Sequence, residues 1–235
     1  MNKVGTMEQA LSRVHDGATI MMGGFGLCGI PEHAVKGLLA RGTRNLTIIS
    51  NNAGVEDAGI GLLVRNGQVR KMISTYIGEN KVLEARVING EIDVELNPQG
   101  TFAERIRAGG AGLGGFFTPT GVGTVIAEGK ETRLINGREY VLEMPLRAEV
   151  AFVKAWKADP MGNLIYRKTA RNFNPVMATA AEFTVAEVEE LVAVGALEPD
   201  AVVTPGVYVD LVVVGEQYEK RIEKRVYRAT SGAGA

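Results

Sequence analysis

The opening part of the chain constrains the fold more than any other stretch of its sequence. Thr19–Met22 and Leu46–Ile49 are short apolar runs, as expected for strands that are buried on both faces. Between them lie a glycine-rich loop, Gly23–Gly29, and a helical pattern that starts at Pro31 and stops near Gly42. A strand, a loop, a helix and a second strand in this order predict a parallel sheet with right-handed crossovers.

The alternation of helices and strands continues along the chain. Helical patterns are expected over Thr6–His15, which opens with a capping box, and over Ala58–Val64 and Asn80–Val87. Apolar or alternating runs predict strands over Val69–Ser74, Ile92–Leu96, Glu149–Trp156, Leu164–Tyr166 and Val207–Val214. Thr184–Val192 fits both a helix and a strand, because its valines have helical spacing while Thr and Val favour strands.

The middle of the chain has a different texture. Residues 109–123 contain seven glycines, which are too many for regular structure. The Asn-Gly pair at 136–137 lies between two apolar runs and predicts a β-hairpin. We therefore expect an α/β fold, with a mainly parallel sheet flanked by helices and an antiparallel hairpin insertion around 110–145. One domain would span residues 1–229, followed by a flexible tail of small residues over 230–235.

The composition argues against several classes of function. The 26 Lys and Arg residues are balanced by 27 Asp and Glu residues, so no positive field favours a nucleic acid partner. One cysteine forms no internal disulfide, and one cysteine with two histidines gives no Cys- or His-built metal site. The apolar runs are shorter than the roughly 20 residues that cross a bilayer, and the N-terminus lacks the apolar core of a signal peptide. We expect a soluble cytoplasmic protein that binds neither nucleic acid nor membrane.

The glycine loop has two interpretations. Gly24, Gly26 and Gly29 spell G-x-G-x-x-G between a strand and a helix, as in the dinucleotide fingerprint. That fingerprint also needs an acidic residue near the end of the second strand, and no acid occurs there until Glu56. Phe25 inside the loop also fits it poorly. An NAD-dependent oxidoreductase therefore stays as the competing enzyme class.

A longer stretch around the loop is more specific. Asp16–Pro31 resembles, position by position, the first signature of the family I coenzyme A transferases. Further segments resemble the A subunit of 3-oxoacid CoA-transferases, most closely the succinyl-CoA:acetoacetate type, and together they cover essentially the whole chain. These segments are Ser50–Gly54, Asn97–Thr101, Gly121–Thr124 and Thr204–Gly206.

The resemblance implies both a reaction and a missing part. Members of the family move CoA between two carboxylic acids through a glutamyl-CoA thioester, with no metal or redox cofactor and with the CoA thioester as substrate. The attacking glutamate lies in the B half, within a Glu-Asn-Gly motif. Glu79-Asn80 copies the first two positions here but lacks the glycine, so we interpret Glu79 as a helix-start residue. We expect no catalytic residue in this chain and a separate B subunit, in a heterodimer or an α2β2 heterotetramer.

The resemblance then implies that this chain forms part of the wall of the site that binds CoA and the acid. The loop would present N–H groups to CoA or to a developing oxyanion, and neutral amides at the carboxyl edge of the sheet would bind the acid. The candidates are Gly24, Phe25, Gly26, Leu27, Cys28, Gly29, Ile30, Asn51, Asn52 and Gln99.

Half of these candidates also have a structural alternative. Gln99 would instead cap the helix that follows it, the two asparagines would form turns, and Phe25 would plug the core. Cys28 at a helix start could act as a nucleophile, but we interpret it as a small buried filler. His15 and His33 read as surface helix residues.

The acids themselves are left open by the sequence. Acetoacetate with succinate is the first expectation, and acetate, butyrate or 3-oxoadipate are alternatives. A binding module that senses an acyl-CoA or a sugar phosphate is the third class, but such a protein usually carries a DNA-binding segment and none is visible in the sequence.

Overall fold

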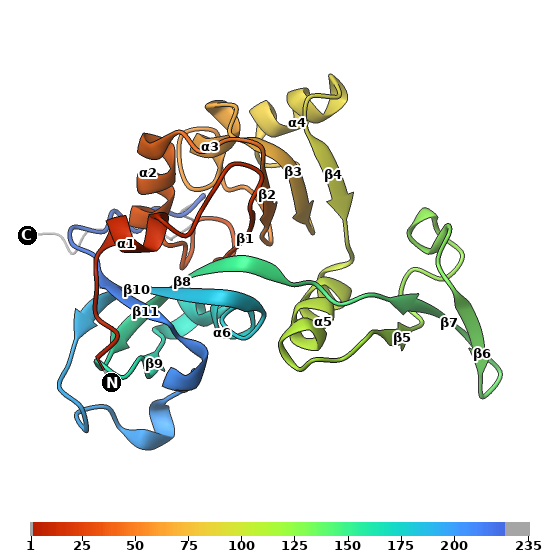
Figure 1. The fold of residues 1–235 in the computed structure, drawn as a ribbon. Helices are drawn as coiled ribbons and strands as arrows, with labels where there is room; N and C mark the ends of the chain where they lie inside the picture. Colours follow the sequence, from red (N-terminus) through yellow and green to blue (C-terminus); the bar gives the residue numbers. More distant parts are fainter. Residues whose placement is uncertain (1, 224–235) are drawn as a thin grey trace, which may run out of the picture.

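The computed structural model describes residues 2–223 and has a mainly parallel sheet as its centre (Figure 1). The strand order is β11-β10-β8-β1-β2-β3-β4, every pair along this path is parallel, and β9 pairs with β8 antiparallel. The strands are β1 (Thr19–Met22), β2 (Leu46–Ile49), β3 (Val69–Ser74), β4 (Asp93–Leu96), β8 (Ala148–Ala158), β9 (Leu164–Ile165), β10 (Ala181–Leu191) and β11 (Leu211–Val214). The predicted fold class is therefore confirmed, whereas the predicted tail 230–235 lies outside the described residues.

Helices cover both faces of this sheet. Alternate residues of β1 point to opposite sides: Ile20 and Met22 pack with the first four helices, whereas Met21 packs with the next two. Because both faces are covered, β1 and β2 consist almost entirely of apolar residues. The helices are α1 (Met7–Leu11), α2 (Glu32–Arg41), α3 (Gly61–Arg65), α4 (Lys81–Ile88), α5 (Gln99–Gly110) and α6 (Asn174–Met177).

A three-stranded antiparallel sheet projects from this body as an arm (Figure 1). Its order is β5-β7-β6, with β5 (Phe116–Thr118), β6 (Thr132–Ile135) and β7 (Arg138–Glu143), and the turn between β6 and β7 holds Asn136 at a φ of 51°. The hairpin expected at 136–137 is confirmed. The expectation that 109–123 has no regular structure is wrong at two places, because α5 ends inside the segment at Gly110 and β5 lies in its middle.

Other boundaries shift for local reasons. The α1 helix stops at Leu11 rather than near His15, and α3 begins at Gly61 rather than Ala58, because a tight turn over Val55 and Ala58 precedes it. The ambiguous segment 184–192 is strand up to Leu191, since β10 lies between two parallel neighbours. Residues 2–223 also contain four short 3₁₀ helices, at Val125–Ala127, Lys168–Arg171, Pro199–Ala201 and Gly206–Tyr208. The last of them lies at the predicted start of β11.

The order of the strands determines where a ligand would collect. From β1, the strands β2, β3 and β4 are added in turn on one side, while β8, β10 and β11 are added on the other. The direction in which strands are added therefore switches between β1 and β8, and open α/β sheets bind ligands at such a point, beyond the carboxyl ends of the strands. The glycine loop leaves β1 at this switch point.

Candidate functional site

The loop after β1 is a tight turn built from its own backbone. Phe25 and Cys28 each donate their N–H to the other's carbonyl oxygen, at 3.0 and 3.1 Å. Gly24, Gly26 and Gly29 have φ values of 116°, 59° and 72°, which side-chain-bearing residues rarely adopt. The three glycines are thus required by backbone conformation, whatever the loop binds.

Two asparagines, one next to α6 and one within it, donate hydrogen bonds to carbonyl oxygens of the loop. Asn174 is fully buried and donates to the carbonyl oxygen of Gly29 at 3.0 Å, while its side-chain oxygen accepts the N–H of Lys154 at 2.7 Å. Asn172 donates to the carbonyl oxygen of Cys28 at 2.9 Å. Sequence reasoning missed both residues, and the one available signal was the polar pair around a buried Phe173.

The start of α2 is occupied by a carboxylate of the protein itself. Glu187 of β10 is fully buried and accepts the N–H groups of His33 and Ala34 at 3.2 and 2.8 Å. Burial raises the pKa of Glu187 above its ordinary value, against the opposing effect of these two donors. In a dinucleotide-binding fold a pyrophosphate would take these donors, so this contact argues against the oxidoreductase interpretation.

A second group of candidates lies where β2 and β4 end. Asn51 is buried, and its carbonyl oxygen accepts the hydroxyls of Ser74 and Thr75 at 2.7 and 3.0 Å. The side-chain amide of Gln99 donates to the side-chain oxygen of Asn51 at 3.3 Å. Asn52 accepts the N–H of Gly54 at 3.0 Å in a turn. The structure thus joins Gln99 to Asn51, while Asn52 acts as a turn former.

The capping alternative for Gln99 is wrong. The residue at the N-cap of α5 is Pro98, and the cap has no side-chain hydrogen bond. Gln99 is the first residue of the helix, and it is exposed. Its amide is therefore available to a ligand at the carboxyl edge of the sheet.

A cleft of ≈ 440 Å³ opens beside the glycine loop. Lys154 on β8 is buried and pairs with Glu189 at 2.7 Å, and desolvation lowers the pKa of Lys154 below its ordinary value despite this partner. The charged lining of the cleft holds more cations than anions and favours an anionic ligand: Glu32, Lys154, Arg167, Lys168, Glu189, Lys220 and Arg221.

The side chains of the loop differ in burial. Leu27 and Ile30 are buried and pack against the loop that follows β2, where they approach Gly59. Phe25 is 47% exposed, so the structural alternative, that it plugs the core, is wrong. Cys28 is half-buried with its sulfur 3.7 Å from the hydroxyl of Thr169.

Three further residues have clear positions. Glu79 directly precedes Asn80, the N-cap of α4, as expected for a helix-start residue. His15 is exposed and pairs with Glu149 at 2.7 Å. His33 differs from its expected surface position, because its Nε2 is buried, with no hydrogen-bond partner among the described residues, and its ring packs edge-on against Tyr218.

Two kinds of feature are absent from residues 2–223. No three His, Cys, Asp or Glu side chains are grouped there as a metal site requires. No helix in the same part of the chain is both long and apolar enough to span a membrane.

Comparison with known families decides between the two interpretations of the loop. The family model described as Coenzyme A transferase matches residues 4–215. The chain belongs to the coenzyme A transferase family. Its glycine loop is therefore the loop of a CoA-transferase, as the resemblance of Asp16–Pro31 predicted.

Individual relatives agree with this family. A Bacillus subtilis protein, named as the A subunit of a probable succinyl-CoA:3-ketoacid coenzyme A transferase, is 57% identical over 100% of this chain and 99% of its own length. An Escherichia coli K12 protein, named as the alpha subunit of acetate CoA-transferase, is 50% identical over 92% of this chain and 98% of its own length. Among solved structures, the acyl-CoA transferase YdiF of Escherichia coli O157:H7 has the same fold, with a TM-score of 0.83 and 22% identity over 97% of this chain and 50% of that chain.

Proposed function

We propose that this chain is the A subunit of an enzyme that moves CoA from succinyl-CoA to a 3-oxoacid such as acetoacetate, and that a separate B subunit completes the enzyme. The observation that carries the proposal is the 57% identity, end to end, with the Bacillus subtilis protein named as the A subunit of such an enzyme. Identity at this level over both whole chains supports a shared fold and a shared subunit role.

The reaction follows from what the resemblance implies. In the B subunit, a glutamate carboxylate attacks the thioester carbonyl of succinyl-CoA, which forms an acyl-glutamyl anhydride and releases CoA thiolate. The thiolate attacks the glutamyl carbonyl, so that succinate leaves and a glutamyl-CoA thioester remains. Acetoacetate then enters and reverses these two steps, which gives acetoacetyl-CoA and the free glutamate. No electron is gained or lost overall, so the reaction needs no redox cofactor.

In this proposal the chain supplies the wall of the site. The glycine loop faces the thioester at the switch point of the sheet. Its N–H groups that have no partner among the described residues, those of Gly24, Gly26, Gly29 and Ile30, would stabilise the negative charge that develops on the carbonyl oxygen. Gln99, backed by Asn51, binds the carboxylate of the acid. A neutral amide suits this task, because a fixed positive charge would also pair with the attacking glutamate and weaken it as a nucleophile.

The relatives are named for different acids, so they do not agree on which acid pair exchanges CoA. The relative named for acetate is 50% identical, against 57% for the one named for succinyl-CoA and a 3-ketoacid. We therefore place succinate and acetoacetate first, with acetate, butyrate and 3-oxoadipate as the alternatives that an assay must include.

The test is reconstitution. The chain is purified alone and together with a B-type chain that carries Glu-Asn-Gly, and both preparations are assayed for acetoacetyl-CoA formation with a panel of acids. We expect no transfer by the chain alone and transfer by the pair, fastest with succinyl-CoA and acetoacetate. Light scattering of the active pair distinguishes a heterodimer from an α2β2 assembly. Transfer by the single chain would refute the division of labour.

A further inference from the structure

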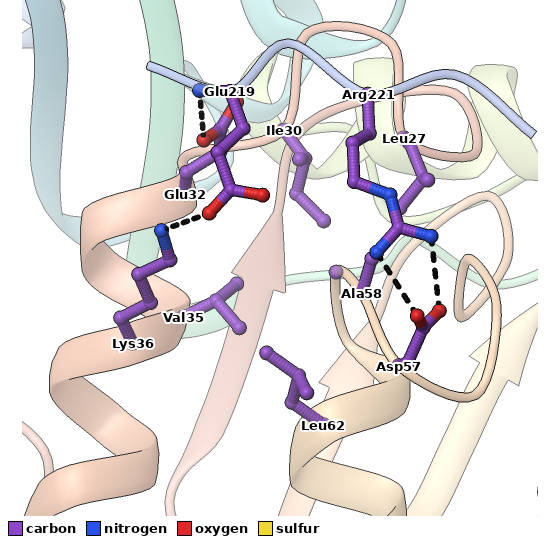
Figure 2. A pocket seen from close by; sticks show the side chains of 11 residues that line it. Leu27, Ile30, Glu32, Val35, Lys36, Asp57, Ala58, Leu62, Glu219 and Arg221 are labelled. Atoms are coloured by element: carbon purple, nitrogen blue, oxygen red, sulfur yellow. Dashed lines mark hydrogen bonds and ion pairs between the residues drawn. The ribbon is translucent and has the colours of Figure 1, made fainter. Parts of the chain in front are cut away.

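Residues 216–223, here called the strap, lie across the start of α2 and the glycine loop after the last strand ends (Figure 2). The carboxylate of Glu32 accepts the backbone N–H groups of Glu219 and Lys220, both at 2.9 Å. Glu219 in turn pairs with Lys36 at 2.7 Å. The strap is therefore fastened to α2 by backbone as well as side-chain contacts.

An aromatic side chain anchors the beginning of the strap. Tyr218 donates its hydroxyl to the carbonyl oxygen of Val188 at 3.2 Å and packs edge-on against His33, with 4.9 Å between the ring centroids. The ammonium of Lys154 lies 3.8 Å from the centre of the Tyr218 ring. This anchor connects the strap to β8 and β10 on the far side of the cleft.

The middle of the strap reaches the loop that follows β2. Arg221 binds both carboxylate oxygens of Asp57, at 3.1 and 3.0 Å. Figure 2 shows this pair among the residues that line a small hollow of ≈ 70 Å³. The bidentate contact with Arg221 holds the pKa of Asp57 below its ordinary value. The strap thus bridges two loops that leave neighbouring strands, one after β1 and one after β2.

The end of the strap contacts the glycine loop itself. A carboxylate oxygen of Glu223 accepts the backbone N–H of Leu27 at 2.5 Å. The same carboxylate fills the space that a Cβ on Gly26 would occupy. The Glu223 carboxylate therefore lies within the loop, and it fits there because Gly26 has no side chain.

We propose that Glu223 is a positioning residue that sets the conformation of the glycine loop. By accepting the Leu27 N–H, it holds the peptide units of Gly26 and Leu27 in place and leaves the rest of the loop to face the ligand. The pair of Arg221 with Asp57 holds the strap close enough to the loop for Glu223 to reach the Leu27 N–H. The effect of Glu223 on the loop concerns this chain alone, whereas its effect on catalysis rests on the proposed function.

The first experiment measures the loop without any activity. Amide hydrogen exchange of Leu27 is followed by NMR in the wild-type chain and in the Glu223→Ala, Glu223→Gln and Glu216→Ala variants. Glu216 is the matched control, because it is an exposed glutamate of the same strap whose side chain makes no hydrogen bond within the described residues. We expect the Leu27 amide to exchange roughly tenfold faster or more in Glu223→Ala, since a charged acceptor is lost. Exchange should stay near wild type in Glu216→Ala and be largely restored in Glu223→Gln, which keeps an acceptor oxygen.

The second experiment uses the same variants in the pair with the B chain. We expect Glu223→Ala to lower kcat by roughly tenfold, with a smaller change in the KM for the acid, while Glu216→Ala behaves as wild type. Equal exchange of Leu27 in Glu223→Ala and Glu216→Ala overturns the proposal. Faster exchange with unchanged kcat in an active pair overturns the catalytic part of it. If the wild-type pair transfers no CoA, the proposed function fails, and the exchange data alone decide the role of Glu223.

Discussion

Gln99 donates its side-chain amide to the side-chain oxygen of Asn51 at 3.3 Å, across 48 positions of sequence. The contact exists because β2 and β4 are parallel strands separated by β3, so their carboxyl ends meet at one edge of the sheet. Asn51 is held in turn by the hydroxyl of Thr75 at 3.1 Å. An exposed amide is thus oriented by a buried one, as a binding group for a carboxylate requires.

Removing this amide should affect the acid more than CoA. We expect Gln99→Ala in the reconstituted pair to lower kcat/KM for acetoacetate by roughly tenfold to a hundredfold, the effect of losing a hydrogen bond to a charged group, with a smaller change for CoA. The exposed and distant Glu198→Ala serves as the control. Steady-state kinetics with each substrate varied separately measure the effect, and unchanged constants for acetoacetate would take Gln99 out of the site.

The sequence predicts best what local pattern determines. The bounds of β1 and β2 agree with the predictions because short apolar runs between turn residues leave little choice of where a strand lies. The bounds of β3 agree as well, although Arg70 and Lys71 interrupt its apolar residues. Thr184–Val192 stays ambiguous in the sequence because its neighbours decide its conformation. As β10, the segment lies between β8, which precedes it in the chain, and β11, which follows it.

The site divides in the same way. The glycine loop, Asn51 and Gln99 could be named from the sequence because a family signature or a strand end marks each of them. Asn174 and Glu187 could not, since each gains its role from a partner about 145 to 153 positions away. A buried Asn or Glu in an ordinary apolar stretch carries no sign of which backbone groups it will satisfy.

Asn174 should be important for stability. Its amide donates to the carbonyl oxygens of Gly29 and Ala170 at 3.0 and 2.9 Å, and its oxygen accepts the N–H of Lys154. We expect Asn174→Ala to lower the free energy of unfolding by about 3 kcal/mol, because it leaves buried polar groups unpaired. Asn174→Asp keeps the acceptor but loses the donors, so it should still destabilise the chain. Urea unfolding measures both variants, and a loss below about 1 kcal/mol in each would contradict the assigned role.

Arg105 connects the arm to the Gln99 turn. It donates to Glu95 at 2.7 Å, to the side chain of Asn97 at 2.5 Å and to the carbonyl oxygen of Met144 at 2.7 Å. Arg105→Met should lower the free energy of unfolding by about 3 kcal/mol, since it leaves partly buried acceptors without a donor. The control is Arg107→Met on the same helix, whose exposed pair with Glu104 is screened by solvent and should contribute little to stability. Equal losses in the two variants, compared by urea unfolding, would mean that the buried network adds nothing.

His15 should titrate above its ordinary pKa of 6.5. The carbonyl oxygen of Asp16 lies 2.9 Å from Nδ1 and Glu149 lies 2.7 Å from Nε2; both raise the pKa of His15, the carbonyl contact most. Because folding raises this pKa, the contribution of protonated His15 to stability is present below pH 6.5 and is lost as the pH rises through the folded-state value. NMR titration of the ring protons should show the raised pKa, and Glu149→Gln should shift it back toward 6.5. A wild-type value at or below 6.5 would mean that the ion pair does not form in solution.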